Sequence, residues 1–164
     1  MAALKRPSWA TVYAGYPKTA SGGDLPATQV FTSIFGSGYD RQTFTNACAT
    51  RLSLGLLNAG IQPRKEFPIK EGNFKGKSIT ASAVNMANWL RSNFGTPDVT
   101  VENPLNKEIL EKQIGNRKGI YVMLPKSNAA FGASGHVTLW HNRNAINGNH
   151  YVQQARVVYF WELK

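Results

Sequence analysis

The chain has 164 residues, of which 42% are hydrophobic and 17% charged, and this composition predicts a folded globular chain. The length suits one domain, so we expect residues 1–164 to fold as a single unit. Nineteen Lys and Arg against nine Asp and Glu give a net charge of +10, which favours an acidic partner. The basic residues are scattered and show no zinc-finger or RNA-binding spacing, so nucleic acid is not favoured.

Two further classes are disfavoured by simple counts. The sequence contains one cysteine, which excludes an internal disulfide. It has no run of about 18 apolar residues, so we expect no membrane insertion. The basic residues near the start precede no apolar stretch, so we expect export, if any, without a secretory signal peptide.

Apolar residues recur at helical spacing in the first two thirds of the chain. They predict helices over 7–16, 28–35, 46–59, 82–94 and 106–114, the first with Pro7 in its opening turn. Glycines follow four of these segments as stop signals. The stretch 61–79 is rich in Pro, Gly and Lys and predicts a long surface loop.

The last third of the chain has the composition of β-strands. Residues 119–124 and 136–140 predict strands, and 151–152 and 155–163 supply further β-branched and aromatic residues. Asn147-Gly148 is a good hairpin-turn signal. Helices followed by antiparallel strands predict an α+β fold, with N-terminal helices packed on a C-terminal antiparallel sheet.

Cys48 is the first candidate for chemistry. It lies near the start of the predicted helix 46–59, where Thr45 or Asn46 can supply a capping oxygen. The helix dipole there favours a thiolate, which is the nucleophilic form of cysteine, and the free N–H groups can hold an oxyanion. A small buried apolar residue remains an equally open interpretation of a lone cysteine.

His136 is the natural partner for such a nucleophile. It follows Gly135 at the start of a predicted strand, and a glycine there allows another backbone or a substrate to come close. Histidine is the usual base for cysteine because its pKa lies near neutrality. The alternative is a half-buried histidine at a strand edge. His141 and His150 lie beside turn residues and are weaker candidates.

A third polar group usually orients the imidazole of a Cys–His pair. A hairpin return after residue 140 brings Asn144, Asn147 and Asn149 back beside the His136 strand, and spacing alone does not choose among them. We expect no metal, because one cysteine and three histidines lack zinc-type spacing, and no other cofactor, because no phosphate-binding glycine loop follows a strand.

Two blocks of sequence resemble a known family. The first is Asn46-Ala47-Cys48-Ala49-Thr50-Arg51-Leu52-Ser53, and the second is Gly135-His136-Val137-Thr138-Leu139-Trp140. Both are similar to blocks of the type VI secretion amidase effectors, family 4, and the chain ends Arg6-Pro7-Ser8-Trp9 and Tyr159-Phe160-Trp161-Glu162-Leu163 look like the family's ends. The resemblance implies a papain- and NlpC-like catalytic domain over residues 1–164.

The resemblance also implies an activity. The substrate would be the γ-D-glutamyl to meso-diaminopimelate amide bond of peptidoglycan stem peptides, with Cys48 as nucleophile and His136 as base. The family's third residue, usually Asp, falls on Asn147. The resemblance further implies an antibacterial toxin that type VI secretion machinery delivers to the periplasm of a target cell, and a cognate immunity protein, usually dimeric. The alternatives are a housekeeping papain-like cell-wall hydrolase and a basic nucleic-acid-binding module in which Cys48 and His136 are structural.

Overall fold

The structure, a computed structural model, describes residues 4–164. Its helices are α1 (Trp9–Gly15), α2 (Ala27–Phe35), α3 (Cys48–Asn58), α4 (Ala83–Phe94), α5 (Lys107–Ile114) and α6 (Asn128–Phe131), with short 3-10 helices η1 (Ile146–Gly148) and η2 (Val152–Gln154). Its strands are β1 (Phe67–Pro68), β2 (Ser78–Ile79), β3 (Val99–Glu102), β4 (Gly119–Pro125), β5 (His136–His141), β6 (Asn144–Ala145) and β7 (Ala155–Glu162). No helix within residues 4–164 is both long and apolar enough to cross a membrane.

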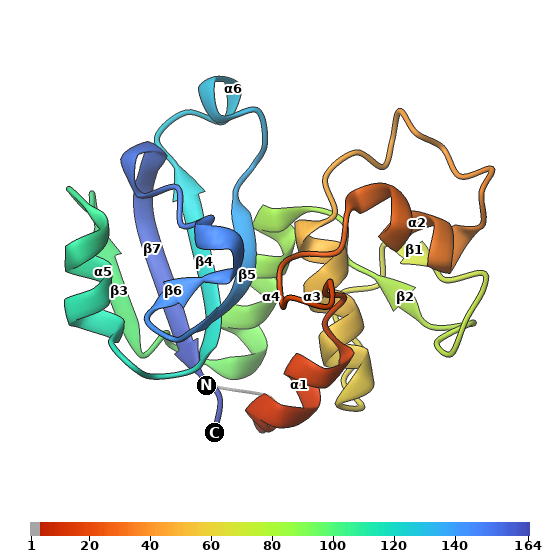
Figure 1. The fold of residues 1–164 in the computed structure, drawn as a ribbon, viewed down its shortest axis with the longest axis horizontal. Coiled ribbons are helices and arrows are strands. Elements are labelled where there is room, and N and C mark those ends of the chain that lie inside the picture. Colours follow the sequence, from red (N-terminus) through yellow and green to blue (C-terminus); the bar gives the residue numbers. More distant parts are fainter. Residues whose placement is uncertain (1–3) are drawn as a thin grey trace.

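A five-stranded sheet forms one half of the molecule. Its strand order is β3-β7-β4-β5-β6, and every neighbouring pair is antiparallel. Helices α3 and α4 lie beside β5, α5 lies by β3, and α2 with the β1–β2 pair forms the opposite end (Figure 1). The predicted α+β fold, with helices packed on an antiparallel sheet, is confirmed. The four-residue strand β3 was not predicted.

Helix α3 lies at the centre of the molecule because it is apolar on two sides. Leu52 and Leu56 are fully buried and pack with residues of β4, β5 and β7. Leu54 and Leu57, on another side, pack with α2 and with the β1–β2 region. Burying a leucine contributes about 1.5–3 kcal/mol relative to exposure, so both contacts fix the position of α3. The residue at its start is therefore held between the two halves.

The predicted helices are confirmed, and several of their caps follow the expected chemistry. The side chains of Ser8, Ser82 and Asn106 each accept a backbone N–H at the start of α1, α4 and α5. Pro7 therefore lies before the cap of α1, and the prediction that it occupies the first helical turn is wrong. Gly36 ends α2 with a positive φ of 88°, which glycine adopts readily.

Two local predictions are wrong. The stretch 61–79 contains the antiparallel pair β1–β2, and Ile69 and Ile79 are buried there, so it is not simply a surface loop. The hairpin between β5 and β6 turns at Asn142 and Arg143, which both have positive φ, and not at Asn147-Gly148. Two positive φ values in succession match the twist that tight hairpin turns require.

Candidate active site

Cys48 is the first residue of α3. The N-cap is Ala47, which offers no side-chain acceptor, so the prediction that Thr45 or Asn46 is the N-cap is wrong in position. Asn46 nevertheless supplies the expected oxygen, because its Oδ1 accepts the N–H of Cys48 at 3.0 Å. This backbone N–H is therefore already bonded in the resting protein, contrary to the expectation that it is free.

The thiol of Cys48 is buried, with 2% of the residue exposed. Burial raises its pKa, while a backbone hydrogen bond with Val137 and the charge of Arg51 act in the opposite direction. The expectation that the helix start makes this thiol acidic is wrong, because loss of hydration disfavours the thiolate more than these contacts favour it. Burial thus favours the neutral thiol form of Cys48 in the resting protein.

His136 is the first residue of β5 and pairs with Met123 of β4. It is 6% exposed, and its ring forms a T-shaped pair with the ring of Tyr151 at a centroid distance of 4.9 Å. Burial and the charge of Arg51 lower the pKa of His136 to about 4. Its Nε2 atom is buried and has no hydrogen-bond partner within residues 4–164. An unsatisfied buried polar atom is costly, and such atoms are often found at functional sites.

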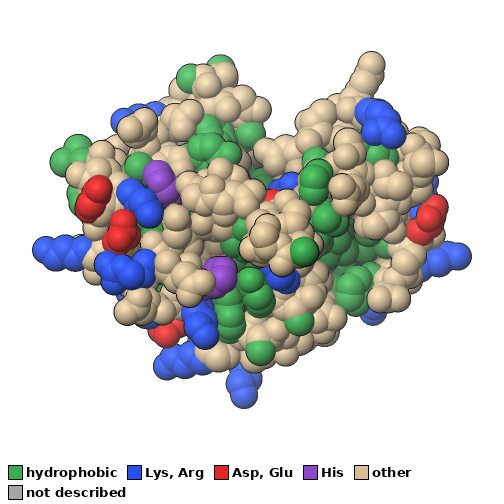
Figure 2. Space-filling model, viewed as in Figure 1, with side chains coloured by type: hydrophobic (Ala, Val, Ile, Leu, Met, Phe, Trp, Pro, Cys, Tyr) green, Lys and Arg blue, Asp and Glu red, His purple; other side chains and the backbone are tan. Residues whose placement is uncertain are grey.

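The helix that begins with Cys48 packs against the strand that begins with His136. The thiol contacts the backbone of Val137, the next residue after the histidine, and Arg51 acts electrostatically on both the thiol and the imidazole. Figure 2 shows the surface hollowed between the part that carries α6 and the part that carries α2, on the side where α3 and β5 begin in Figure 1. The structure thus brings the two predicted residues to neighbouring segments.

Gly135 has the role expected of it, which is to allow a close approach. A Cβ atom at this position would lie 2.8 Å from the carbonyl oxygen of Met123 and 3.2 Å from a side-chain carbon of Leu124. Real Cβ atoms essentially never approach so closely, so a larger residue would push β4 and β5 apart. The group that comes close to Gly135 is the backbone of the neighbouring strand β4. This contact fixes the position at which β5 begins with His136.

Asn147 lies in η1, where it adopts a positive φ of 62°. Its Oδ1 accepts the backbone N–H of Asp24 at 3.2 Å. The structure therefore connects Asn147 to the loop after α1. Of the other candidates, Asn144 keeps a buried Oδ1 without a partner among the described residues, and the backbone N–H of Asn149 is bonded to Ile146.

A buried polar cluster beside Cys48 was not predicted. It comprises Asp24, Arg51, Tyr16 and Thr138, which come from the loop after α1, from α3, from α1's C-cap and from β5. Arg51 was not among the predicted site residues, and nothing in the Ser-Gly-Gly-Asp loop marks Asp24 as buried. The only available signal was the position of Arg51, three residues after Cys48 and thus one helical turn away.

The remaining histidines lie outside this cluster. His141 packs against the rings of Trp9 and Tyr13. The Nδ1 atom of His150 accepts the N–H of Val152. Over residues 4–164, no group of three or more His, Cys, Asp or Glu side chains is placed to hold a metal ion.

A cysteine that opens a helix packed on an antiparallel sheet, with a histidine opening the adjacent strand, defines the papain- and NlpC-like class of α+β folds. Within that class, a sequence profile described as type VI secretion system amidase effector protein 4, Tae4, matches residues 44–161. The chain belongs to this family of amidase effectors. No curated protein sequence matches the chain significantly.

Solved structures agree with this assignment. Tae4 from Salmonella typhimurium, in its effector–immunity system with Tai4, is 26% identical with a TM-score of 0.71, over 98% of this chain and 100% of that one. Tae4 from Enterobacter cloacae is 21% identical with a TM-score of 0.76 over the full length of both chains. The Tae4–Tai4 complex from Enterobacter cloacae gives 23% identity and a TM-score of 0.71, over 98% and 100% of the two chains. At these two lower identities the likeness shows the fold.

Proposed function

We propose that the protein hydrolyses the γ-D-glutamyl to meso-diaminopimelate amide bond of peptidoglycan stem peptides, with Cys48 as nucleophile and His136 as general base. One observation carries the proposal: in a chain of an amidase family, the only cysteine opens α3 next to the strand that opens with His136. The unpartnered Nε2 of His136 supports it further, since a general base needs a nitrogen free to accept a proton.

Acylation begins from a neutral thiol and a neutral imidazole. Sγ of Cys48 attacks the carbonyl carbon of the amide, its proton passes to His136, and the carbonyl π electrons move to the oxygen to give a tetrahedral oxyanion. The C–N bond then breaks, and the imidazolium returns the proton to the departing amine. The glutamyl part remains bound to Cys48 as a thioester.

Deacylation uses the same histidine in the reverse sense. A water molecule gives one proton to His136 as its oxygen attacks the thioester carbon. The C–S bond breaks, the proton returns to the sulfur, and the product leaves as a free carboxylic acid that ionises in water. Because the pKa of His136 is lowered to about 4, its imidazole is neutral and able to accept a proton at neutral pH.

Asn147 is the third polar residue that we propose for the site. An amide oxygen has two lone pairs, so Oδ1 can accept an imidazole N–H while it keeps the N–H of Asp24. As a neutral acceptor it stabilises an imidazolium less than a carboxylate would, which favours a mechanism that starts from neutral partners. No cofactor or metal enters these steps.

The proposed setting is competition between bacteria. The protein would be delivered by type VI secretion machinery to the periplasm of a target cell. The net charge of +10 favours attraction to an anionic wall polymer. A cognate immunity protein, expected to be a dimer, would protect the producer, and the solved complexes of related effectors with Tai4 support that partner.

Mass spectrometry of purified muropeptides tests this proposal. Wild-type protein should release products ending in D-glutamate together with a new amine on diaminopimelate, and Cys48→Ala and His136→Ala should release neither. His141→Ala is the matched control, because that histidine lies outside the site, and it should give the wild-type products. Cleavage at another bond, or by Cys48→Ala at the wild-type rate, would refute the proposal.

A further inference from the structure

Asp24 is a carboxylate in an unusual place, because its side chain is only 7% exposed in a short polar loop. The loop is closed by backbone bonds from Thr19 to Gly23 and from Leu25 to Pro17. Three separate elements, α3, β5 and η1, are linked at its end. Each contact involves a buried polar group, and leaving such a group without a partner costs free energy of folding. These contacts therefore hold the loop in one position.

The first contact is with the nucleophile helix. Nη1 of Arg51 lies 3.8 Å from Oδ2 of Asp24, and Nε of Arg51 donates to the carbonyl oxygen of Leu25 at 2.9 Å. The Arg51 side chain is 11% exposed, so both charges of this pair are largely removed from water. Breaking such a pair by removing one partner leaves an uncompensated buried charge. Asp24 therefore constrains α3 one turn after Cys48.

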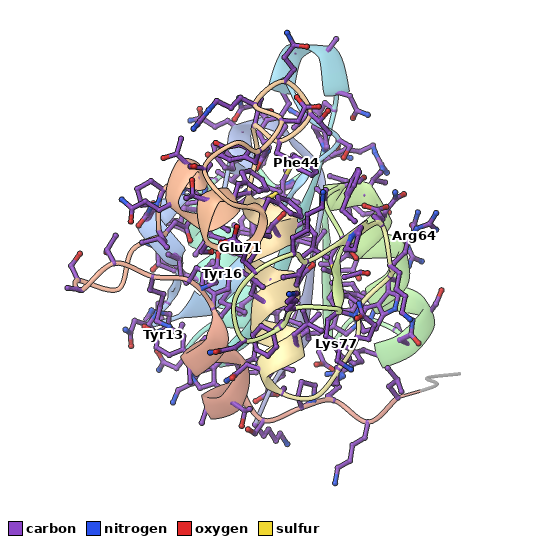
Figure 3. The ribbon with its side chains drawn as sticks, turned by 90° about the vertical axis from the view of Figure 1, so that its right-hand side faces the viewer. Tyr13, Tyr16, Phe44, Arg64, Glu71 and Lys77 are labelled. Atoms are coloured by element: carbon purple, nitrogen blue, oxygen red, sulfur yellow. The ribbon has the colours of Figure 1, made fainter. Side chains whose placement is uncertain are left out.

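The second contact reaches the histidine strand. The hydroxyl of Tyr16 donates to Oδ1 of Asp24 at 2.8 Å and also lies 3.1 Å from Oγ1 of Thr138. Thr138 is fully buried and is two residues after His136, so the two side chains share a face of β5. Burial and the charge of Asp24 raise the pKa of Tyr16 well above its ordinary value, so the hydroxyl stays a donor. Figure 3 shows Tyr16 beside the central helix α3.

The third contact is with η1. Oδ1 of Asn147 accepts the backbone N–H of Asp24, and a Cβ atom at Gly23 would lie 2.4 Å from that same oxygen. The loop and Asn147 are therefore in close contact. The carboxylate of Asp24 thus contacts α3 directly and β5 through Tyr16, and its backbone N–H contacts η1. These three elements carry Cys48, His136 and Asn147 respectively.

We propose that Asp24, with Tyr16 and Arg51, is a positioning residue that fixes the Cys48 helix relative to the His136 strand. The inference rests on the proposed function only in naming those two residues as the reacting pair. Asp24 touches neither the sulfur nor the imidazole; it acts through other side chains, and its charge is the smallest of the contributions that raise the pKa of Cys48. Small displacements between reacting groups can cost about 100-fold in rate, so loss of this connection should appear in kcat.

The test compares Asp24→Asn and Tyr16→Phe with Asp98→Asn. Asp98 is a matched control because it also pairs with an arginine, Arg6, at 2.5 Å and accepts a backbone N–H, from Glu162, on another part of the molecule. Cleavage of purified stem peptides should show kcat reduced by about 10- to 100-fold in the first two variants with KM little changed. The control should lose some thermal stability and keep its kcat. All rates are measured where each variant is fully folded.

Two further readouts separate positioning from general destabilisation. The two substitutions should be non-additive in the double variant, because both residues belong to one hydrogen-bonded network. Alkylation of Cys48, the only cysteine, should become faster in Asp24→Asn and Tyr16→Phe as the packing of α3 on β5 loosens, and should not change in Asp98→Asn. Tyr16→Phe is the decisive variant, because it keeps the charge of Asp24, which itself raises the pKa of the thiol. Faster alkylation together with a lower kcat supports the proposal.

The proposal is overturned if Asp24→Asn loses no more kcat than Asp98→Asn and its thiol reacts at the wild-type rate. Additive effects of the two substitutions on kcat would also count against it. The alkylation measurement needs no catalysis, so it judges positioning even if Cys48→Ala retains activity, which is the separate result that would refute the proposed function.

Discussion

The burial of His136 should make the stability of the protein depend on pH in a defined way. Its pKa is about 4 in the folded protein, against 6.5 for an ordinary histidine. Between these values the unfolded chain binds a proton that the folded protein does not, so stability falls as the pH is lowered. The loss begins as the pH falls through 6.5 and is complete below about 4.

The size of the effect follows from the same two values. One pKa unit corresponds to about 1.4 kcal/mol, so the difference between 6.5 and about 4 is worth about 3 kcal/mol of unfolding free energy. Replacing His136 by Gln removes the titrating group and keeps a polar side chain. Whatever its absolute stability, His136→Gln should therefore lose about 3 kcal/mol less than the wild type between pH 7 and pH 4.

Urea unfolding at a series of pH values measures this difference. The carboxylates whose pKa values are lowered, Asp40 and Asp98, are present in both proteins, so their contribution cancels in the comparison. His141→Gln provides a second comparison, because His141 is far less buried. Its replacement should therefore change the pH dependence of the unfolding free energy less than the replacement of His136 does. Parallel curves for the wild type and His136→Gln would refute the claim that His136 is held neutral by burial.

Four other substitutions, at three positions, test neighbouring parts of the site. Asn147→Asp keeps an acceptor and should preserve or raise the rate of stem-peptide cleavage, and Asn147→Ala should lower it; unchanged rates in both would remove Asn147 from the site. Gly135→Ala places a Cβ 2.8 Å from the Met123 oxygen, so it should cost about 1–3 kcal/mol in urea unfolding and reduce kcat; a stable, fully active variant would contradict the packing argument. Ser53→Ala removes the acceptor of the buried Thr80 N–H and should cost about 1–3 kcal/mol with kcat unchanged, and an unaltered melting temperature would show that this bond is dispensable.

Much of the fold could be predicted because the local signals agree with the tertiary structure. The spacing of Leu52 and Leu56 marks the helix that carries Cys48, and glycines end α2 and α4 where predicted. Strand β3 was missed because it is four residues long and only Val99 is buried, which gives too little pattern for a prediction. The β1–β2 pair was missed because its burial depends on contacts with α2 and α3, distant in sequence.

The candidate site could be predicted in its residue types but not in its electrostatics. The helix start suggested an acidic thiol at Cys48, and only the folded structure shows that burial outweighs that effect. Asp24 could not be recognised, because its partner Arg51 lies 27 positions further along the chain and its loop has the composition of an ordinary turn. Long-range polar contacts of this kind leave no periodic signal in a single sequence.

The most direct test of the central claim is to trap the acyl-enzyme. Wild-type protein is mixed with a purified stem peptide, quenched in acid within one turnover, digested and analysed by mass spectrometry. A glutamyl-containing thioester on the peptide that carries Cys48, lost on treatment with hydroxylamine, is the expected result. Rapid cleavage with no acyl group on that peptide at any quench time, in a protein whose Cys48→Ala variant also cleaves, would contradict it.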